Sequence, residues 1–282
     1  MTTVGQLLLG YVEHHAPTVA NPERIAYAID ALTDFWADKT LHEVTPKACR
    51  AYIASRKVAP GTVRRELGVL RAALNHGVRQ RWIAAAPPVD LPSKPEPKQR
   101  WLTRGEAARL LWACRAPDRR HLARLILIQL YTGTRPGAAL ALRWRAGPEG
   151  GWIDVDRGLL FRAAEGARVT KKRKPPAKMP RQLVAHARRW RRDGAAAVIS
   201  YRGKPVIKVR KSWAAACEAA RIEGATPHTL RHTAITWAMQ RGAPVIEACG
   251  YFGVSQRTME DVYLHHHPEY MGGVVAAMER KR

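Results

Sequence analysis

Hydrophobic residues in the first part of the chain recur every three or four positions, which is the spacing of one face of a helix. One such segment covers residues 25–36 and another covers residues 63–78. Asn21 and Thr45 each precede a proline, and a capping side chain followed by proline is a typical helix start. The pattern therefore predicts a small helical bundle over residues 1–86.

Prolines dominate the segment that follows the bundle. They are Pro87, Pro88, Pro92, Pro95 and Pro97. Proline has no backbone N–H to donate, and it disfavours helix in the residue before it. We therefore expect a linker over residues 87–100, followed by a second domain over residues 101–282.

The second domain is predicted to be mostly helical with a small antiparallel sheet. Thr103 and Glu106 form a capping-box pattern at a helix start, and the apolar residues 122–131 indicate a buried helix that ends near Gly133. Short segments rich in β-forming residues predict strands at residues 152–155, 159–161 and 168–170. Further helices are expected from residue 181 and at residues 211–221, 229–240, 244–249, 256–264 and 270–278. The expected fold class is therefore mainly α.

The charge of the chain points to a polyanionic partner. Its 282 residues include 48 Lys and Arg against 23 Asp and Glu, which gives a formal net charge of +25. Such a field attracts nucleic acid and holds it in a salt-dependent way. No apolar run approaches the roughly 18–20 residues that a membrane span requires, and the N-terminus lacks the pattern of a secretory signal. We therefore expect a cytoplasmic, nucleoid-associated protein that binds nucleic acid and not a membrane.

Two arginines, a histidine and a tyrosine are the main candidates for chemistry. Arg231 follows His228 by three positions near a predicted helix start, so their side chains share a face, where the helix N-terminus also attracts phosphate. Arg135 lies in a glycine-containing turn, and Tyr263 lies late in the chain. A guanidinium matches phosphate oxygens and keeps its charge, whereas a tyrosine nucleophile needs a cationic environment and a proton acceptor. Taken alone, each is also explained by a solvated arginine or an ordinary capped helix.

The joint order of these residues resembles that of the tyrosine recombinases, the phage integrase family. The first arginine box of that family is similar to TGTR at residues 132–135 and LALRW at residues 140–144. The second box is similar to HTLRHT at residues 228–233, and Tyr263 stands at the usual position of the nucleophile. The helical N-terminal part, with GTVRREL at residues 61–67, resembles the SAM-like core-binding domain of the family. The resemblance therefore covers the whole chain.

This resemblance implies site-specific cleavage and rejoining of double-stranded DNA, for the integration or excision of a mobile element. Tyr263 would form a 3′-phosphotyrosyl intermediate while Arg135 and Arg231 clamp the phosphate. His228 would hydrogen-bond the phosphate or shuttle the tyrosine proton. Because the phosphotyrosine keeps the energy of the broken ester, no metal, nucleotide or other cofactor is expected.

Two further expectations follow from the resemblance. The family protonates the leaving 5′-hydroxyl with a lysine between two strands, which points to Lys171, with Lys172 and Lys174 close behind. Residues 270–278 resemble the tail helix that docks on a neighbouring copy, so a homo-tetramer on two DNA sites is expected. Neither the target site nor any accessory protein can be identified from the sequence.

The chain departs from the family pattern at two positions. An acidic residue commonly follows the first arginine by three positions, where this chain has Ala138. The third-box histidine or tryptophan is replaced by Val254, which cannot donate to a phosphate oxygen. The main alternative is therefore a catalytically weakened DNA-binding protein of the same fold. A generic basic nucleic-acid-binding protein and a topoisomerase without site preference are the others.

Three consecutive histidines, His265, His266 and His267, follow the candidate nucleophile. Successive helical side chains diverge, and no cysteine or carboxylate lies nearby at ligand spacing, so no metal site is predicted. Our hypothesis is that His265 supplies the donor that is missing at Val254. The four cysteines are scattered along the chain and are expected to be reduced core residues.

Basic residues outside the two boxes are candidate DNA contacts. Residues 168–192 contain eleven Lys or Arg and no Asp or Glu, and most such charges contact phosphates or are solvated. The tryptophans are expected mainly in the core, Trp112 included, with Trp190 the best candidate for base stacking. The candidate DNA contacts are Arg64, Arg65, Arg173, Lys178, Arg188, Arg189, Arg191 and Arg192.

Overall fold

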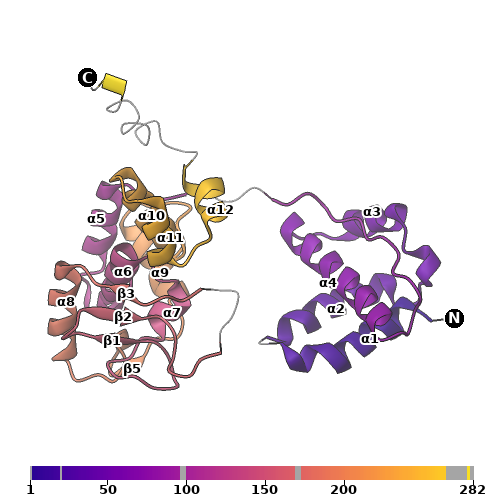
Figure 1. Ribbon diagram of the computed structural model, residues 1–282, viewed down its shortest axis with the longest axis horizontal. Helices are drawn as coiled ribbons and strands as arrows, with labels where there is room; N and C mark the ends of the chain where they lie inside the picture. The colour runs from indigo at the N-terminus through magenta and orange to yellow at the C-terminus, as the bar shows by residue number, and fades with distance from the viewer. Residues whose placement is uncertain (1, 20, 96–99, 169–172, 265–277, 280–282) are drawn as a thin grey trace. The chain divides into compact units, whose positions relative to one another are not determined.

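The chain forms two compact units, the N-terminal unit Met1–Pro97 and the C-terminal unit Lys98–Arg282. The computed structural model describes residues 2–19, 21–95, 100–168, 173–264 and 278–279 (Figure 1). No helix in these ranges is long and apolar enough to cross a bilayer. Helices predominate in both units, and among the described residues β-strands occur only in the C-terminal unit. The predicted fold class is therefore confirmed.

The N-terminal unit is a helical bundle. Thr45 is the expected N-cap of its helix, and its hydroxyl accepts the N–H of Ala48 at 3.2 Å. At the second predicted start the N-cap is Pro22, and Asn21 just before it accepts the N–H of Arg24 at 3.3 Å. The first helix was not singled out by the hydrophobic pattern, although Thr3 and Gln6 form a capping box at its start. The helical elements are α1 (Val4–His15), η1 (Ala16–Thr18), α2 (Glu23–Trp36), η2 (Leu41–Glu43), α3 (Pro46–Ser55) and α4 (Pro60–Arg79).

Helix α4 packs against both α1 and α2, and its apolar face supplies Leu67, Leu70 and Leu74 to the core. One acid is buried with them. Glu66 is 4% exposed and accepts hydrogen bonds from Arg56 at 2.7 and 3.0 Å and from the Tyr52 hydroxyl at 2.7 Å. Burial alone would raise the pKa of Glu66, but these hydrogen bonds lower it below its ordinary value. The bundle therefore contains one buried carboxylate with a matching cation.

The C-terminal unit contains the remaining helices. The predicted helix at residues 229–240 coincides with α10, which packs against α6 and α11. The helical elements are α5 (Arg104–Ala113), η3 (Pro117–Arg119), α6 (Arg120–Thr132), α7 (Pro136–Leu140), α8 (Arg181–Arg191), α9 (Arg210–Ala219), α10 (Thr229–Gln240), α11 (Val245–Phe252), α12 (Gln256–Met259) and the π-helical turn η4 (Glu260–Leu264).

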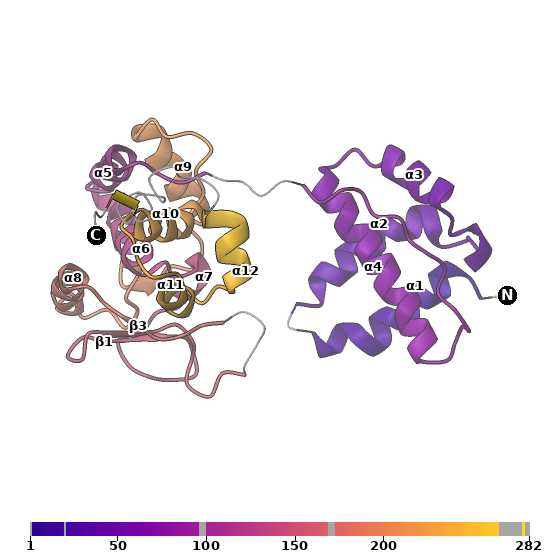
Figure 2. The ribbon, with the colours of Figure 1, turned by 45° about the horizontal axis from the view of Figure 1, so that its top comes forward.

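A three-stranded antiparallel sheet, in the order β1-β2-β3, borders this unit below the helices in Figure 2. Strand β1 (Trp152–Asp154) pairs with β2 (Leu159–Phe161), so that Ile153 lies opposite Leu160. Residues 169–170 of the predicted third strand lie outside the described ranges, and in the described chain β2 pairs with β3 (Ala177–Lys178). Ala177 is buried there, whereas Arg168 is exposed and lies outside any strand.

A second, two-stranded sheet of β4 (Ser200–Tyr201) and β5 (Lys204–Pro205) was not predicted. Each strand has only two residues, too few to show an alternating pattern. Gly203, with φ at +76° in the intervening turn, is the one local indication, since positive φ favours glycine.

Tryptophan positions correct two of the sequence expectations. Trp112 is 66% exposed at the end of α5, where the Arg115 guanidinium lies 3.8 Å from the centre of its ring. Trp190 is buried in the main core and stacks on His186, so it is not available to stack on a base.

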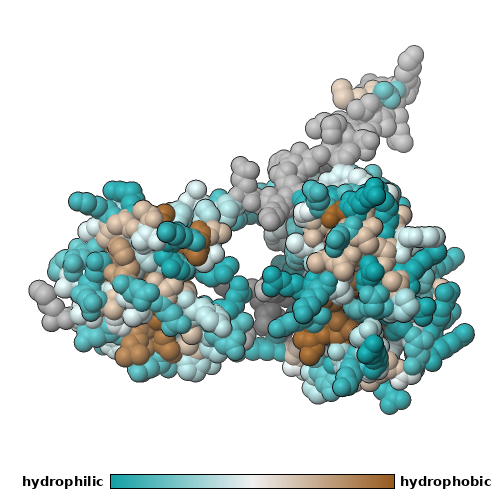
Figure 3. All heavy atoms as spheres, turned by 180° about the vertical axis from the view of Figure 1, so that it is seen from behind, coloured by the Kyte–Doolittle hydropathy of each residue, from teal (hydrophilic) through white to brown (hydrophobic). Residues whose placement is uncertain are grey.

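The arginines next to Trp190 on α8 are exposed, and hydrophilic side chains cover most of the face of the C-terminal unit seen in Figure 3.

Candidate active site

The candidate site is built on the turn that ends helix α6. The helix stops at Gly133, which adopts left-handed φ of 61°, a conformation that glycine accepts at least cost. A Cβ at this position would lie 2.5 Å from the Phe252 ring, so the close approach of α11 also requires glycine. Two residues later, Arg135 caps the short helix α7. The turn therefore fixes the backbone of the first candidate arginine against α11.

Arg231 lies on the first turn of α10 and is 4% exposed. Its guanidinium donates to the carbonyl oxygens of Gly133 at 2.6 Å and Phe252 at 2.7 Å. Burial lowers the pKa of Arg231 to about 10, and the charge of Arg135 contributes, so the group remains protonated at neutral pH. Arg231 therefore joins the turn after α6 to the end of α11 while keeping its positive charge.

Arg135 is half-buried beside it. It donates to the carbonyl oxygens of Arg173 at 2.9 Å and Gly253 at 3.5 Å. Gly253 also has left-handed φ, and a Cβ there would lie 2.7 Å from Pro175 Cδ. The segment 173–175, which ends the connection between β2 and β3, is therefore packed against Arg135.

A third arginine of this cluster, Arg162, was missed by the sequence reasoning. It follows β2, is 3% exposed and donates to four groups that belong to three separate segments. Burial lowers the pKa of Arg162 to about 10. The sequence did contain an indication, because Arg162 shares the inward face of its strand with buried Leu160. Its acceptors are the carbonyl oxygens of Thr132 at 2.7 Å, Pro175 at 2.5 Å and Tyr251 at 2.9 Å, and the Thr134 hydroxyl at 3.1 Å.

Tyr263 lies in the turn η4 and is half-buried. It packs against an apolar cluster of the C-terminal unit to which side chains of α10 and α11 contribute. Its hydroxyl is 2.9 Å from Nδ1 of His232. Burial raises the pKa of Tyr263 to about 12, while the charges of Arg231 and Arg135 act to lower it. The structure thus brings the tyrosine into the field of both predicted arginines, although the three come from distant parts of the chain.

His228 lies at the exposed start of α10. Desolvation lowers the pKa of His228, with contributions from the Arg231 and Arg135 charges. Its ring meets the His232 ring edge to face at 5.2 Å, and it has no hydrogen-bonding partner within the described ranges. A neutral, exposed imidazole beside two guanidinium groups can donate to an anion placed between them.

The family of the chain follows from a comparison with known proteins. The model of the phage integrase family matches residues 100–269. The chain belongs to this family. The match covers most of the C-terminal unit. It includes the four predicted residues that the structure brings together, which are Arg135, His228, Arg231 and Tyr263.

Similarity to individual members extends over both units of this integrase-family protein. The integrase of Salmonella phage P22 is 23% identical over 229 residues, which cover 77% of this chain and 57% of that integrase. This chain therefore spans little more than half the length of its curated relative. A Tn1549 transposon integrase in complex with a circular intermediate DNA has a TM-score of 0.80 at 15% identity, covering 99% of this chain and all of that chain. A lambda integrase dimer bound to a COC' core site has a TM-score of 0.72 at 18% identity, covering 93% and 95%.

The two departures from the family pattern have structural counterparts here. Val254 is buried in the same apolar cluster as Met259, and Tyr263 packs against that cluster. Val254 is therefore part of the apolar cluster against which Tyr263 packs. At Ala138 no acid is available to orient Arg135, and the carbonyl groups of Arg173 and Gly253 hold its guanidinium instead.

Several predicted site residues of this integrase-family chain lie outside the described ranges. They are Lys171, Lys172, His265, His266 and His267. Lys174 is described and exposed. Elsewhere in the described chain, no group of three or more His, Cys, Asp or Glu side chains is placed to hold a metal ion.

The candidate DNA contacts differ in their exposure. Arg64 is half-buried and donates to the Pro92 carbonyl oxygen, and Arg191 lies 3.9 Å from the Asp156 carboxylate. Contact between these residues and DNA is a prediction. Exposed candidates are Arg65, Arg173, Lys178, Arg188, Arg189, Arg191 and Arg192.

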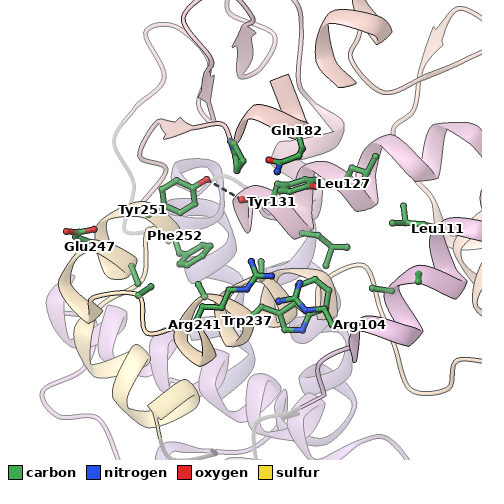
Figure 4. Close-up of a pocket in the computed structure, with 18 residues that line it drawn as sticks. Arg104, Leu111, Leu127, Tyr131, Gln182, Trp237, Arg241, Glu247, Tyr251 and Phe252 are labelled. Carbon is green, nitrogen blue, oxygen red and sulfur yellow. Dashed lines mark hydrogen bonds between the residues drawn. The ribbon is translucent and has the colours of Figure 1, made fainter. Parts of the chain in front are cut away.

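A cavity of about 680 Å³ lies between α5, α6, α10 and α11. Figure 4 shows its lining, including the bond from the Tyr251 hydroxyl to the Tyr131 carbonyl oxygen at 3.2 Å. The Arg104 guanidinium stacks 3.4 Å from the centre of the Trp237 ring on another wall. Phe252 belongs both to this lining and to the support of Arg231. The cavity is therefore adjacent to the arginine cluster without containing it.

Proposed function

We propose that this protein is a site-specific tyrosine recombinase that cleaves and rejoins double-stranded DNA. The observation that carries the proposal is the position of the Tyr263 hydroxyl in the field of Arg231 and Arg135. Among the described residues, no carboxylate pairs with either arginine. Such a cluster is suited to stabilise the negative charge that develops on a phosphodiester under attack.

In the proposed reaction, Tyr263 attacks the phosphorus and forms a 3′-phosphotyrosine while the 5′-oxygen leaves. Arg135, Arg231 and His228 bind the phosphate oxygens. Lys171, with Lys172 or Lys174 as substitutes, donates a proton to the leaving oxygen. Reversal by a 5′-hydroxyl rejoins the strand, because the phosphodiester charge and bond type are kept throughout. This chemistry requires no metal, nucleotide or other cofactor.

We propose that the DNA is gripped by both units, with residues 1–86 as the core-binding domain and residues 101–282 as the catalytic domain. The net charge of +25 supports a polyanionic partner, and the exposed arginines of α8 provide phosphate contacts. Integration or excision of a mobile element in the cytoplasm, on nucleoid DNA, is the proposed setting. The structures of similar integrases are DNA complexes, which is consistent with this reading.

We further propose assembly into a homo-tetramer on two DNA sites. Residues 270–278 include Tyr270, Met271, Val274, Val275 and Met278, which are suited to pack into an apolar pocket of a neighbouring copy. The cavity lined by Leu111, Leu127 and Leu130 offers such a pocket. Truncation after residue 268 should then leave DNA binding by single copies intact and abolish the four-copy complex in analytical ultracentrifugation.

A nicked duplex that loses a short fragment after cleavage tests the enzymatic proposal, since the covalent complex cannot religate. We expect a covalent protein–DNA adduct that is absent from Tyr263→Phe and unchanged in Tyr27→Phe, which alters a surface tyrosine of α2. DNA binding without an adduct would instead identify the weakened DNA-binding relative, which the substitutions at Ala138 and Val254 favour. A two-site recombination assay then separates a recombinase from a topoisomerase.

A further inference from the structure

The histidine that contacts the nucleophile is not the one expected from the sequence. His228 was the predicted candidate to shuttle the tyrosine proton, yet His232 Nδ1 lies 2.9 Å from the Tyr263 hydroxyl. We propose that His232 is the group that accepts the Tyr263 proton as the tyrosine attacks phosphorus, which leaves His228 to bind the phosphate. This inference rests on the proposed function and deepens the description of its site.

The geometry of α10 explains why His228 and His232 have different roles. His228 and His232 are separated by four residues, so both lie on one face, one turn apart. The His228 ring is at the exposed helix start, and the half-buried His232 ring is one turn deeper. There it lies 5.7 Å from the Tyr263 ring, with the two planes tilted by 30°. His232 thus reaches the Tyr263 hydroxyl, while His228 lies at the exposed helix start, where a substrate can reach it.

The protonation state of His232 suits an acceptor. Burial, and then the charges of His228 and Arg231, lower the pKa of His232 to about 4. The ring is therefore neutral at physiological pH, and a neutral imidazole nitrogen accepts a hydrogen bond from a phenol. An entering phosphodiester brings negative charge beside Arg231, which favours the protonated form of a neighbouring histidine. The basicity of His232 is therefore expected to rise when DNA binds.

The proposed step balances in atoms and charge. The Tyr263 oxygen bonds to phosphorus as its proton moves to Nδ1 of His232, and the bond from phosphorus to the 5′-oxygen breaks. The leaving oxygen takes a proton from a lysine of residues 171–174. The phosphodiester keeps its single negative charge, and the net change in the protein is one proton lost by lysine and one gained by histidine. Rejoining runs through the same transfers in reverse.

Single-turnover adduct formation on the nicked duplex tests this role. General acid–base catalysis typically contributes about 10²–10⁴-fold, so His232→Ala should form adduct about 100-fold or more slowly while its affinity for DNA changes little. His232→Gln can still accept a hydrogen bond but cannot take a proton, and we expect a similar loss. His42→Ala, at an exposed histidine of η2, is the matched control and should react at the normal rate.

Three readouts separate proton transfer from a merely structural role. Added imidazole should accelerate His232→Ala about tenfold or more and leave His232→Gln unchanged, because only the smaller residue leaves room for a replacement base. A fluorinated tyrosine at position 263, whose phenol is more acidic, should reduce the His232→Ala defect. In addition, the rate of His232→Ala should rise about tenfold per pH unit above neutrality, as expected for a tyrosine with a raised pKa.

The possible outcomes decide between the inferences. Normal adduct formation by His232→Gln would overturn the role of His232 as proton acceptor and leave the recombinase proposal intact. A slow His232→Ala that responds neither to imidazole nor to the acidity of the tyrosine would also overturn it, since the defect would then be structural. If the unaltered protein forms no adduct, the proposed function fails and this inference fails with it.

Discussion

The two units bury charge in different ways. In the N-terminal unit the buried charge is Glu66, and the Arg56 guanidinium contacts it with two hydrogen bonds. In the C-terminal unit the buried charges are Arg162 and Arg231, which donate to backbone carbonyls and to the Thr134 hydroxyl. Within the described ranges, no carboxylate pairs with either of these arginines.

This difference separates a structural ion pair from a binding site. A buried charge costs several kcal/mol of desolvation unless an opposite charge and hydrogen bonds offset it. The Glu66 pair is offset within the unit and needs nothing from outside. Burial lowers the pKa of both arginines, and the charge of Arg135 adds to this effect. Because no carboxylate of the described ranges offsets their positive charge, that charge is left for an external anion. We infer that the reacting centre is indicated by buried arginines that have no carboxylate partner, and not by buried charge in general.

The largest expected effect is that of Arg231→Gln, which keeps a donor but removes the charge. Loss of a preorganised group that stabilises developing charge typically costs about 10²–10³-fold in rate. Single-turnover adduct formation should therefore fall by at least that factor at saturating DNA. Arg56→Gln, the same change in the N-terminal unit, should leave the rate within about twofold, since its charge serves only Glu66. Equal losses in both variants would remove the distinction between the two units.

The next effect is on stability and concerns Arg162→Met. Removing a donor that satisfies buried carbonyls costs about 1–3 kcal/mol for each acceptor left unpaired, so the C-terminal unit should lose about 3 kcal/mol or more in denaturant unfolding. Thr134→Val, which removes one acceptor of Arg162 and the hydrogen bond between the Thr132 and Thr134 hydroxyls, should lose about 1–3 kcal/mol.

Arg162 also contacts the segment that follows the candidate lysines, through the Pro175 carbonyl. A substrate with sulfur in place of the 5′-oxygen needs no proton on its leaving group, so it should react nearly as fast with Arg162→Met as with the unaltered protein. An equal defect with the oxygen and sulfur substrates would show that Arg162 does not position the lysine segment.

Glu66→Gln tests the other side of the comparison. The variant leaves Arg56 without its counter-charge, and we expect the N-terminal unit to lose about 2 kcal/mol, as measured by thermal or denaturant unfolding. Because Glu66 is not part of the arginine cluster, the rate of adduct formation at saturating DNA should stay within about twofold of that of the unaltered protein. A large drop in that rate would contradict the assignment of Glu66 to structure.

The smallest effect is a pH dependence that His232 gives to the C-terminal unit. Its folded pKa of about 4 lies below the ordinary 6.5, so the unfolded chain binds a proton that the folded chain does not. The stabilisation is complete above pH 6.5 and is lost as the pH falls toward 4. Between pH 7 and 5, unfolding of the unaltered protein should lose on the order of 1 kcal/mol more than that of His232→Gln. Parallel pH curves for the two proteins would contradict this expectation.

Much of the helical structure follows from the sequence alone, because its determinants are local. Apolar patterns located α2, α4 and α6, and the capping threonines Thr45 and Thr103 marked two helix starts. The order of Arg135, His228, Arg231 and Tyr263 along the chain pointed to the family, since spaced motifs are visible without coordinates. The strand β3 was not predicted, because a two-residue strand is defined by its partner, Leu159 and Leu160 of β2, and not by its own composition.

The sequence thus determined most of the helices, the family and four of the residues that meet at the site. Only the tertiary structure decided that Arg162 joins the arginine cluster, that Val254 belongs to the apolar cluster behind Tyr263, and that His232 contacts the Tyr263 hydroxyl. These contacts join residues more than thirty positions apart in the case of His232 and Tyr263, or depend on which side chain is buried. The local sequence pattern predicts on which face of a helix or strand a residue lies. Which residue of another element it contacts depends on how the helices pack in the tertiary structure.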